Sequence, residues 1–212
     1  MKLTRGSMLE FGFVLFMGII LITSIIQGAW FNASVAGAGI VSGLIPFMLE
    51  KAFKTEFDAK MKSAYIIFLF ASQYLGSIVG LYSNGWWDTF LHVLSGVFLA
   101  FLGFDFFSRL DEDIRLEMPK RFLFVYIVVF SMAGAALWEM YEFTSDIVLR
   151  TTMQGNGNDD TMVDIIAGSL GGIIAALLVT EIHRKEQIKR RMEPPKNNSA
   201  YNPFETSRAY CL

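Results

Sequence analysis

Charge and cysteine are both scarce in this sequence. Only 18% of its 212 residues are Asp, Glu, Lys or Arg, whereas a typical soluble domain has about 25%. The single cysteine, Cys211, excludes a disulfide scaffold, and its place second from the end does not form a prenylation signal. The sequence contains no nucleotide-binding loop, haem motif or cysteine-based metal motif. A water-exposed globular domain is therefore excluded, together with several common cofactor sites.

Apolar residues make up 53% of the chain and gather in long runs. Each run is close to the 20 or so residues needed to cross roughly 30 Å of hydrocarbon. The runs cover residues 9–28, 33–49, 63–82, 88–108, 121–143 and 161–182. The first follows Lys2 and Arg5 as in a signal peptide, but no small-residue cleavage site closes it, so we interpret it as an uncleaved helix. The sequence thus predicts an all-α, six-helix transmembrane bundle over residues 1–183.

The basic residues predict the orientation of this bundle. They lie before the first run, after the second, after the fourth and after the sixth, and Arg150 is the one exception. Because basic loops stay in the cytoplasm, both termini are predicted to be cytoplasmic. The tryptophans agree, since all of them fall at the predicted outer ends of helices, where an aromatic belt is expected. They are Trp30, Trp86, Trp87 and Trp138.

Residues 184–212 form a polar segment that contains Pro194 and Pro195, and we predict a disordered cytoplasmic tail. Its basic first half either binds anionic lipid headgroups, at about 1 kcal/mol per basic residue, or only keeps the C-terminal segment on the cytoplasmic side of the membrane. This short stretch is the sole basic segment, so we expect membrane lipids as partners and no nucleic acid. Glycine pairs four residues apart predict close helix packing. They are Gly39/Gly43, Gly76/Gly80 and Gly168/Gly172.

Acidic residues in and beside the last three runs lie at one depth, near the predicted outer surface. They recur at i, i+3 or i+4, which places them on one face of each helix. If these three helices pack together, their carboxylates and one imidazole converge. The residues are Asp88, His92, Glu139, Glu142, Asp146, Asp159, Asp160 and Asp164.

Crowded carboxylates in a low-dielectric site repel one another unless protons or cations compensate them. The sequence offers only Arg150 and His92 at this end, so we predict one divalent metal ion, with Mg²⁺, Mn²⁺, Zn²⁺ and Ca²⁺ all compatible. The predicted ligands are Asp88, His92, Glu139 and Asp164, and the predicted acid–base residues are Glu142 and Asp160.

Plain structural roles compete with this interpretation. Asp88 and Asp160 also suit helix N-caps, Asp146 also suits a loop, and His183 suits a cap at the cytoplasmic end of the last helix. Glu139 and Glu142 have no such role, because the dipole at a helix C-terminus opposes negative charge. An acid within a membrane helix is by default a candidate for function.

Three motifs occur in order on the last three runs. They are W-D-x-x-x-H-x-x-x-G over 87–96, W-E-x-x-E over 138–142, and D-T-x-x-D-x-x-x-G over 160–168. Together they resemble the YjdF-like multipass membrane proteins of bacteria and, distantly, VanZ-like proteins, in which an Asn stands where this chain has Gly168. The resemblance implies a bacterial plasma-membrane protein. It implicates Asp88, His92, Glu139, Glu142, Asp160 and Asp164.

Three functions remain open at this point. The first is a metal-dependent enzyme acting on a lipid or lipid-linked substrate at the outer leaflet. The second is a non-catalytic envelope or stress protein in which an ion ties three helices together. The third is a cation- or proton-coupled transporter, which the apolar middle of the helices disfavours, because transporters carry polar groups near the bilayer midplane.

Overall fold

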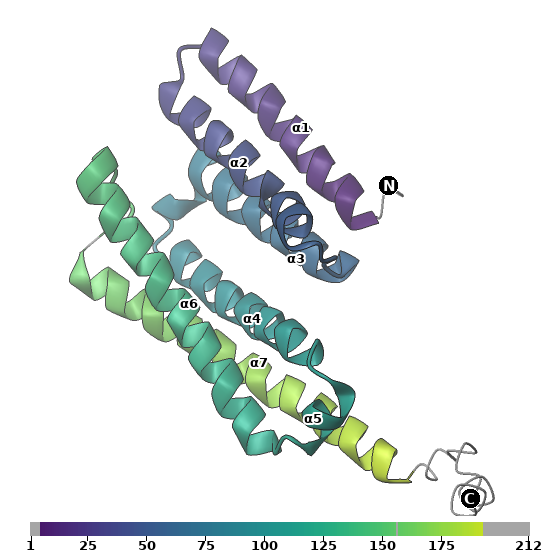
Figure 1. The fold of residues 1–212 in the computed structure, drawn as a ribbon. Helices are drawn as coiled ribbons and strands as arrows, with labels where there is room; N and C mark the ends of the chain where they lie inside the picture. The colour runs from purple at the N-terminus through teal and green to yellow at the C-terminus, as the bar shows by residue number, and fades with distance from the viewer. Residues whose placement is uncertain (1–4, 156, 193–212) are drawn as a thin grey trace, which may run out of the picture.

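A computed structural model describes residues 5–155 and 157–192, and in these residues all regular structure is helical (Figure 1). Five helices are long and apolar enough to cross a membrane. They are α1 (Arg5–Ile26), α2 (Trp30–Phe53), α4 (Trp87–Ser108), α6 (Lys120–Leu149) and α7 (Asn158–Met192). The prediction of a multi-pass, all-helical protein is therefore confirmed.

The predicted third helix differs from an ordinary α-helix. The chain forms α3 (Ala59–Leu69), continues directly as a π-helix, η1 (Phe70–Ile78), and then makes a 3₁₀ turn, η2 (Leu81–Ser83). Gly80 has a left-handed backbone with φ of 91°, so it ends the helix and does not pack against a neighbour as predicted. Gly76 does pack, since a Cβ there would collide with the ring of Tyr82.

The last two long helices extend further than the hydropathy predicts. α6 continues to Leu149, so Asp146 is helical. α7 continues to Met192, so the prediction of disorder from residue 184 is wrong for 184–192. A short helix, α5 (Glu112–Glu117), holds this extension in place. Arg115 forms an ion pair with Glu186 at 2.5 Å, and Gln187 donates to the carbonyls of Leu116 and Met118 at 2.8 Å. The rest of the predicted tail, 193–212, lies outside the described residues.

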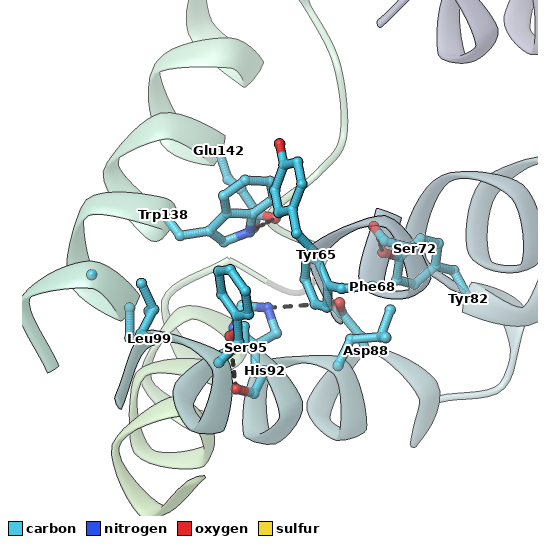
Figure 2. A pocket seen from close by; sticks show the side chains of 14 residues that line it. Tyr65, Phe68, Ser72, Tyr82, Asp88, His92, Ser95, Leu99, Trp138 and Glu142 are labelled. Atoms are coloured by element: carbon cyan, nitrogen blue, oxygen red, sulfur yellow. Dashed lines mark hydrogen bonds and ion pairs between the residues drawn. The ribbon is translucent and has the colours of Figure 1, made fainter. Parts of the chain in front are cut away.

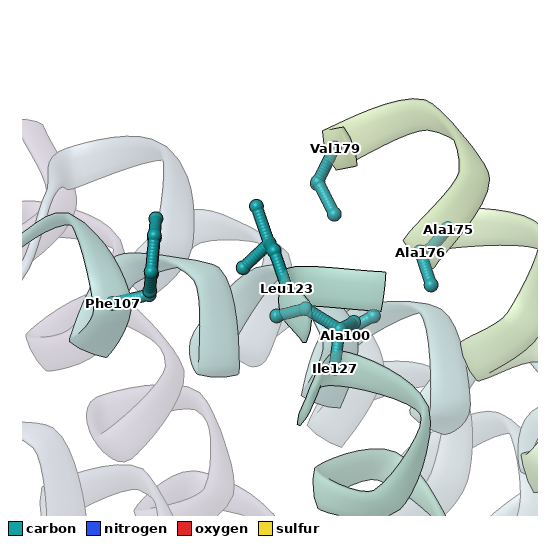
Figure 3. Packing of buried hydrophobic residues seen from close by; sticks show 7 residues of the cluster. All are labelled: Ala100, Phe107, Leu123, Ile127, Ala175, Ala176 and Val179. Carbon is teal, nitrogen blue, oxygen red and sulfur yellow. The ribbon is translucent and has the colours of Figure 1, made fainter. Parts of the chain in front are cut away.

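The helices that form the bundle lie in two groups (Figure 1). One contains α1, α2 and α3 with η1; the other contains α4, α6 and α7; and α3 contacts α4 between them. The second group has an apolar core of small and branched side chains (Figure 3). Its buried members are Ala100, Phe107, Leu123, Ile127, Ala175, Ala176 and Val179.

Glycine sets the close contact between α4 and α7. A Cβ on Gly96 would collide with the carbonyl of Gly168, and a Cβ on Gly171 would collide with the carbonyl of Val93. Backbones approach this closely in membrane helices only where side chains are absent or small. The predicted packing of Gly168 and Gly172 is thus borne out, with Ala135 and Ser131 of α6 against them.

The first residue of α1 and the last of α7 lie at the same end of the molecule (Figure 1). At this end Arg109, which follows α4, donates to the carbonyl of Glu56 at 3.1 Å. His183 also lies here but is fully buried, with Nε2 3.2 Å from the carbonyl oxygen of Met118. It therefore fixes the loop before α6 and does not simply cap α7.

Candidate functional site

At the opposite end of the second helix group, α4 and α7 bring three ligand-type side chains together. Asp88 and His92 come from the first two turns of α4, and Asp164 comes from the second turn of α7. One ligand atom from each lies within 4.8 Å of the other two. Nε2 of His92 is 3.7 Å from Oδ1 of Asp88 and 3.8 Å from Oδ2 of Asp164. These separations are too long for hydrogen bonds.

Glu139 of α6 lies on the other side of the same imidazole ring. Its Oε1 is 3.7 Å from Nδ1 of His92, and its side chain is only 4% exposed. Thr161 lies nearby, yet neither carboxylate oxygen of Glu139 has a partner in hydrogen-bond geometry among the described residues. An orphaned buried carboxylate is costly. It therefore indicates that something else compensates this charge.

The sequence of α6 explains how Glu139 and Glu142 reach the interior. Its buried residues recur every three or four positions, the spacing of one helix face. The first buried residues of this face are mostly apolar, and the two acids follow toward the C-terminal end of the helix. The buried residues are Leu123, Ile127, Ser131, Ala135, Glu139, Glu142 and Ser145. Glu142 is 7% exposed, and its Oε1 accepts a hydrogen bond from Nε1 of Trp138 at 2.8 Å.

A cavity of about 200 Å³ adjoins this group (Figure 2). Asp88, His92 and Ser95 project toward it from α4, while Trp138 and Glu142 project toward it from α6. Four aromatic side chains from α3, η2 and α4 form part of the remaining wall: Tyr65, Phe68, Tyr82 and Phe98. The rest of the wall is made by Ser72 of η1, by Leu91 and Leu99 of α4, and by Gly134 and Ala135 of α6. The Ser95 hydroxyl donates its proton to the backbone carbonyl of His92 at 2.8 Å, so this proton is already in a hydrogen bond.

The charges of the site are unbalanced. In the part of the chain that the structure describes, no lysine or arginine forms an ion pair with Asp88, Glu139, Glu142 or Asp164. Among the described residues, His92 is the basic side chain that contacts Asp88, Glu139 and Asp164. Three carboxylates around one imidazole, with Glu142 on the wall of the adjoining cavity, require protons or a cation to coexist.

Of the three remaining predicted acids, which all lie within the described residues, Asp146 and Asp159 form no hydrogen bond or ion pair with this group, whereas Asp160 is close enough to interact electrostatically with Asp88, Glu139 and Asp164. Asp146 accepts hydrogen bonds from the Thr151 hydroxyl and from the backbone of Met153 and Gln154, so it organises the loop between α6 and α7. Asp159 is exposed. Asp160 is partly exposed and abuts Gly155 of that loop, and it does not line the cavity.

The donor set suits a hard or borderline divalent ion. Oxygen ligands with one imidazole fit Mn²⁺, Zn²⁺ or Mg²⁺ better than a soft metal. Two ligands that are each about 2.1 Å from a tetrahedral ion lie roughly 3.4 Å apart. The 3.7 and 3.8 Å separations around Nε2 of His92 are close to that value. The residues of the site therefore fit a metal ion.

The sequence pattern missed a second buried charged group, in the first three helices. Lys62 of α3 is 3.2 Å from Glu10 of α1 and 2.8 Å from Glu50 of α2, and it donates to Ser7. Glu10 is fully buried. Acidic residues within the helices therefore lie at two depths, because this group is at the end opposite to Asp88, Glu139 and Asp164. The signal available was Glu10 itself, an acid inside an apolar run.

Pro46 lies inside α2 beside this second group and removes one of the helix's backbone hydrogen bonds. Pro46 has no N–H, so the carbonyl of Ser42 loses its partner in the helix. The hydroxyl of Tyr65 donates to that carbonyl at 3.0 Å, and the Phe47 amide donates to Oε1 of Glu10 at 2.8 Å. Side chains of α1 and α3 thus satisfy the backbone that the proline disturbs, as the membrane interior requires.

Comparison with known proteins gives a family. Residues 8–185 match the family described as predicted membrane protein (DUF2238), and the chain belongs to it. The YjdF-like resemblance fits this family, whose match also covers the first three helices. A protein of Thermotoga maritima, described as an uncharacterized protein, is 30% identical over 147 residues, which are 66% of this chain and 71% of the relative. No solved structure matches the chain.

Proposed function

We propose that this member of the DUF2238 family is a metal-dependent enzyme that acts on a lipid or lipid-linked substrate at the outer leaflet of a bacterial plasma membrane. It crosses the membrane six times, with both termini in the cytoplasm. The basic residues of the loops lie at the end shared by the two described termini, and the acidic site lies at the other end, which supports this orientation.

One observation carries the proposal. The group formed by Asp88, His92 and Asp164 adjoins a largely apolar cavity, and Glu139, a buried carboxylate without a hydrogen-bond partner among the described residues, lies on the other side of the imidazole. Asp88, Nε2 of His92 and Asp164 are the ligands in this proposal. Glu139 then faces Nδ1 of His92 as an orienting carboxylate, a common arrangement around metal-bound histidine. The role proposed for Glu139 thus changes from ligand to orienting residue.

A divalent ion held there supplies a Lewis acid that polarises a carbonyl or phosphoryl oxygen. Glu142 is the best placed acid–base residue, since it lines the cavity together with Asp88 and His92. Its hydrogen bond from Trp138 fixes one carboxylate oxygen and leaves the other for proton transfer. Asp160 is the weaker candidate because it abuts the α6–α7 loop.

The alternative of a purely structural ion is disfavoured by the glycine contact. Because Gly96, Gly168 and Gly171 already let α4 and α7 touch through their backbones, no ion is required to join these helices. The transporter alternative is disfavoured because a cluster of buried apolar side chains lies among α4, α6 and α7.

Metal analysis tests the proposal. Purified protein in lipid nanodiscs is titrated with Mn²⁺, and free ion is measured by electron paramagnetic resonance. We expect one bound ion per chain, lost in the Asp88→Ala/His92→Ala variant and kept in Asp159→Ala, an exposed acid on α7 that serves as the matched control. Absence of binding by well-folded wild-type protein, with Zn²⁺ also tested, would refute the metal site.

Turnover is tested next on the same preparations. Outer-leaflet lipids are screened with Mn²⁺-loaded protein, and Glu142→Gln is expected to abolish turnover while it keeps the bound ion. Simultaneous loss of ion and turnover would assign Glu142 to the ligand shell. Full activity in Glu142→Gln would exclude it as the acid–base residue.

A further inference from the structure

We propose that the cavity recognises an alkylammonium group, so that the substrate is an amphiphile with a cationic head. The assignment of a substrate class rests on the proposed function. The binding of an ammonium group depends on the side chains that line the cavity and does not require a metal ion.

The walls combine aromatic faces with negative charge. Five rings line the cavity, from α3, η2, α4 and α6: Tyr65, Phe68, Tyr82, Phe98 and Trp138. A cation over such a face is attracted by the ring quadrupole, by about 2 kcal/mol or more where water is excluded. Quaternary ammonium groups are bound in this way by cages of aromatic side chains.

Two carboxylates complete the cage. Asp88 and Glu142 line the cavity from α4 and α6, and none of the described residues that line it is a lysine or arginine. Trp138 donates to Glu142 at 2.8 Å, which holds a ring face and a carboxylate in one fixed arrangement. In protein without a metal ion both acids attract an ammonium head. When the proposed ion is bound, Asp88 is a metal ligand and Glu142 is the acid that attracts the ammonium head.

Size and exposure limit what enters. Ligand pockets for whole drug-sized molecules span about 300–1,000 Å³, so a cavity of about 200 Å³ admits a head group and leaves a long chain outside. Trp138 is 43% exposed and Tyr82 is 37% exposed. Both residues therefore line the cavity and also reach the surface of the protein.

The experiment uses choline and its uncharged isostere 3,3-dimethylbutan-1-ol. Full-length protein in nanodiscs of phosphatidylglycerol is titrated with each by calorimetry. We expect choline to bind at least tenfold more tightly than the isostere. We also expect Trp138→Leu to lower the affinity for choline at least tenfold. Trp30→Leu, at a tryptophan that does not line the cavity and is 70% exposed, should leave binding unchanged.

Further arms identify the source of the ammonium group and keep the two proposals separate. If the natural ligand is a lipid headgroup, phosphatidylethanolamine in the nanodiscs competes with choline and weakens choline binding tenfold. If the natural ligand is a free amine, the same nanodiscs leave choline binding unchanged. Both results support recognition of an ammonium group. Equal binding of choline and isostere, or no choline binding by protein with wild-type thermal stability, overturns it. Mn²⁺ binding measured on the same samples separates this failure from failure of the metal site.

Discussion

Oε1 of Glu139 lies 3.7 Å from Nδ1 of His92, while Nε2 of the same ring faces Asp88 and Asp164. The imidazole thus stands between one buried acid and a pair of acids. Ring nitrogens of histidine have different roles in such sites, because the partner of one nitrogen fixes the tautomer and orientation of the other.

Replacement of Glu139 should weaken metal binding without removing it. We expect Glu139→Gln to lower Mn²⁺ affinity about 10- to 100-fold, the usual effect of losing an orienting carboxylate, with one ion still bound at saturation. Titration followed by electron paramagnetic resonance measures both quantities. Loss of the ion at saturating Mn²⁺ would make Glu139 a direct ligand, as the sequence analysis proposed, and an unchanged affinity would remove it from the site.

The contact between α4 and α7 predicts an unusually sensitive glycine. Gly96→Ala should destabilise the protein by about 1–3 kcal/mol or more, because the added methyl group meets the backbone of Gly168, which cannot rotate away. Gly12→Ala in α1 is the matched control, since a Cβ there meets nothing within 4 Å. It should leave stability unchanged or raise it by up to about 1 kcal/mol. Thermal unfolding in detergent compares the two; equal melting temperatures would contradict the packing described here.

The buried contact of Lys62 with Glu10 predicts that Lys62→Met is destabilised and that Glu10→Gln restores its stability. Lys62→Met keeps the volume of the side chain but removes the cation that faces both Glu10 and Glu50, so we expect a loss of about 3–5 kcal/mol in stability. Glu10→Gln in the same chain removes the charge of the more deeply buried acid and should restore most of the loss, because the side chain of Glu50 is 19% exposed. Thermal unfolding of both variants tests this. A double variant no more stable than Lys62→Met would show that the ion pair is not the cause.

The lone cysteine gives a direct test of orientation. Cys211, which lies outside the described residues, should not react with a membrane-impermeant maleimide in intact spheroplasts, because the C-terminus is predicted to be cytoplasmic. In a Cys211→Ser background, Thr151→Cys places a thiol on the exposed α6–α7 loop, and this thiol should react before lysis. Labelling in the reverse order would invert the topology and move the acidic site to the cytoplasmic face.

Hydropathy and motif spacing were sufficient to predict much of the site. The motifs at Asp88, Glu139 and Asp164 place one acid-bearing face on each of α4, α6 and α7, and the structure joins these faces as expected. Capping was a competing role for Asp88. Its Oδ1 lies 3.7 Å from His92, which places it in the group of ligand-type side chains whether or not it also favours the start of α4.

Other features could not be predicted from spacing. The π-helix at Phe70–Ile78 was not predicted, because an apolar run indicates a helix but does not distinguish a π-helix from an α-helix. The helical segment 184–192 depends on α5, which supplies partners to Glu186 and Gln187 from a distant part of the chain.

The sequence by itself determined that this protein is a multi-pass helical membrane protein, because run length and charge segregation are local properties that lipid and water select directly. It also determined which helix faces carry acids. Only the tertiary structure decided that Glu139 faces Nδ1 of His92 and not the Nε2 side, and that aromatic rings of α3 and η2 enclose the cavity. Those relationships depend on helix rotation and on which helices touch, and close packing of side chains, including the glycine contact of Gly96 with Gly168, fixes both.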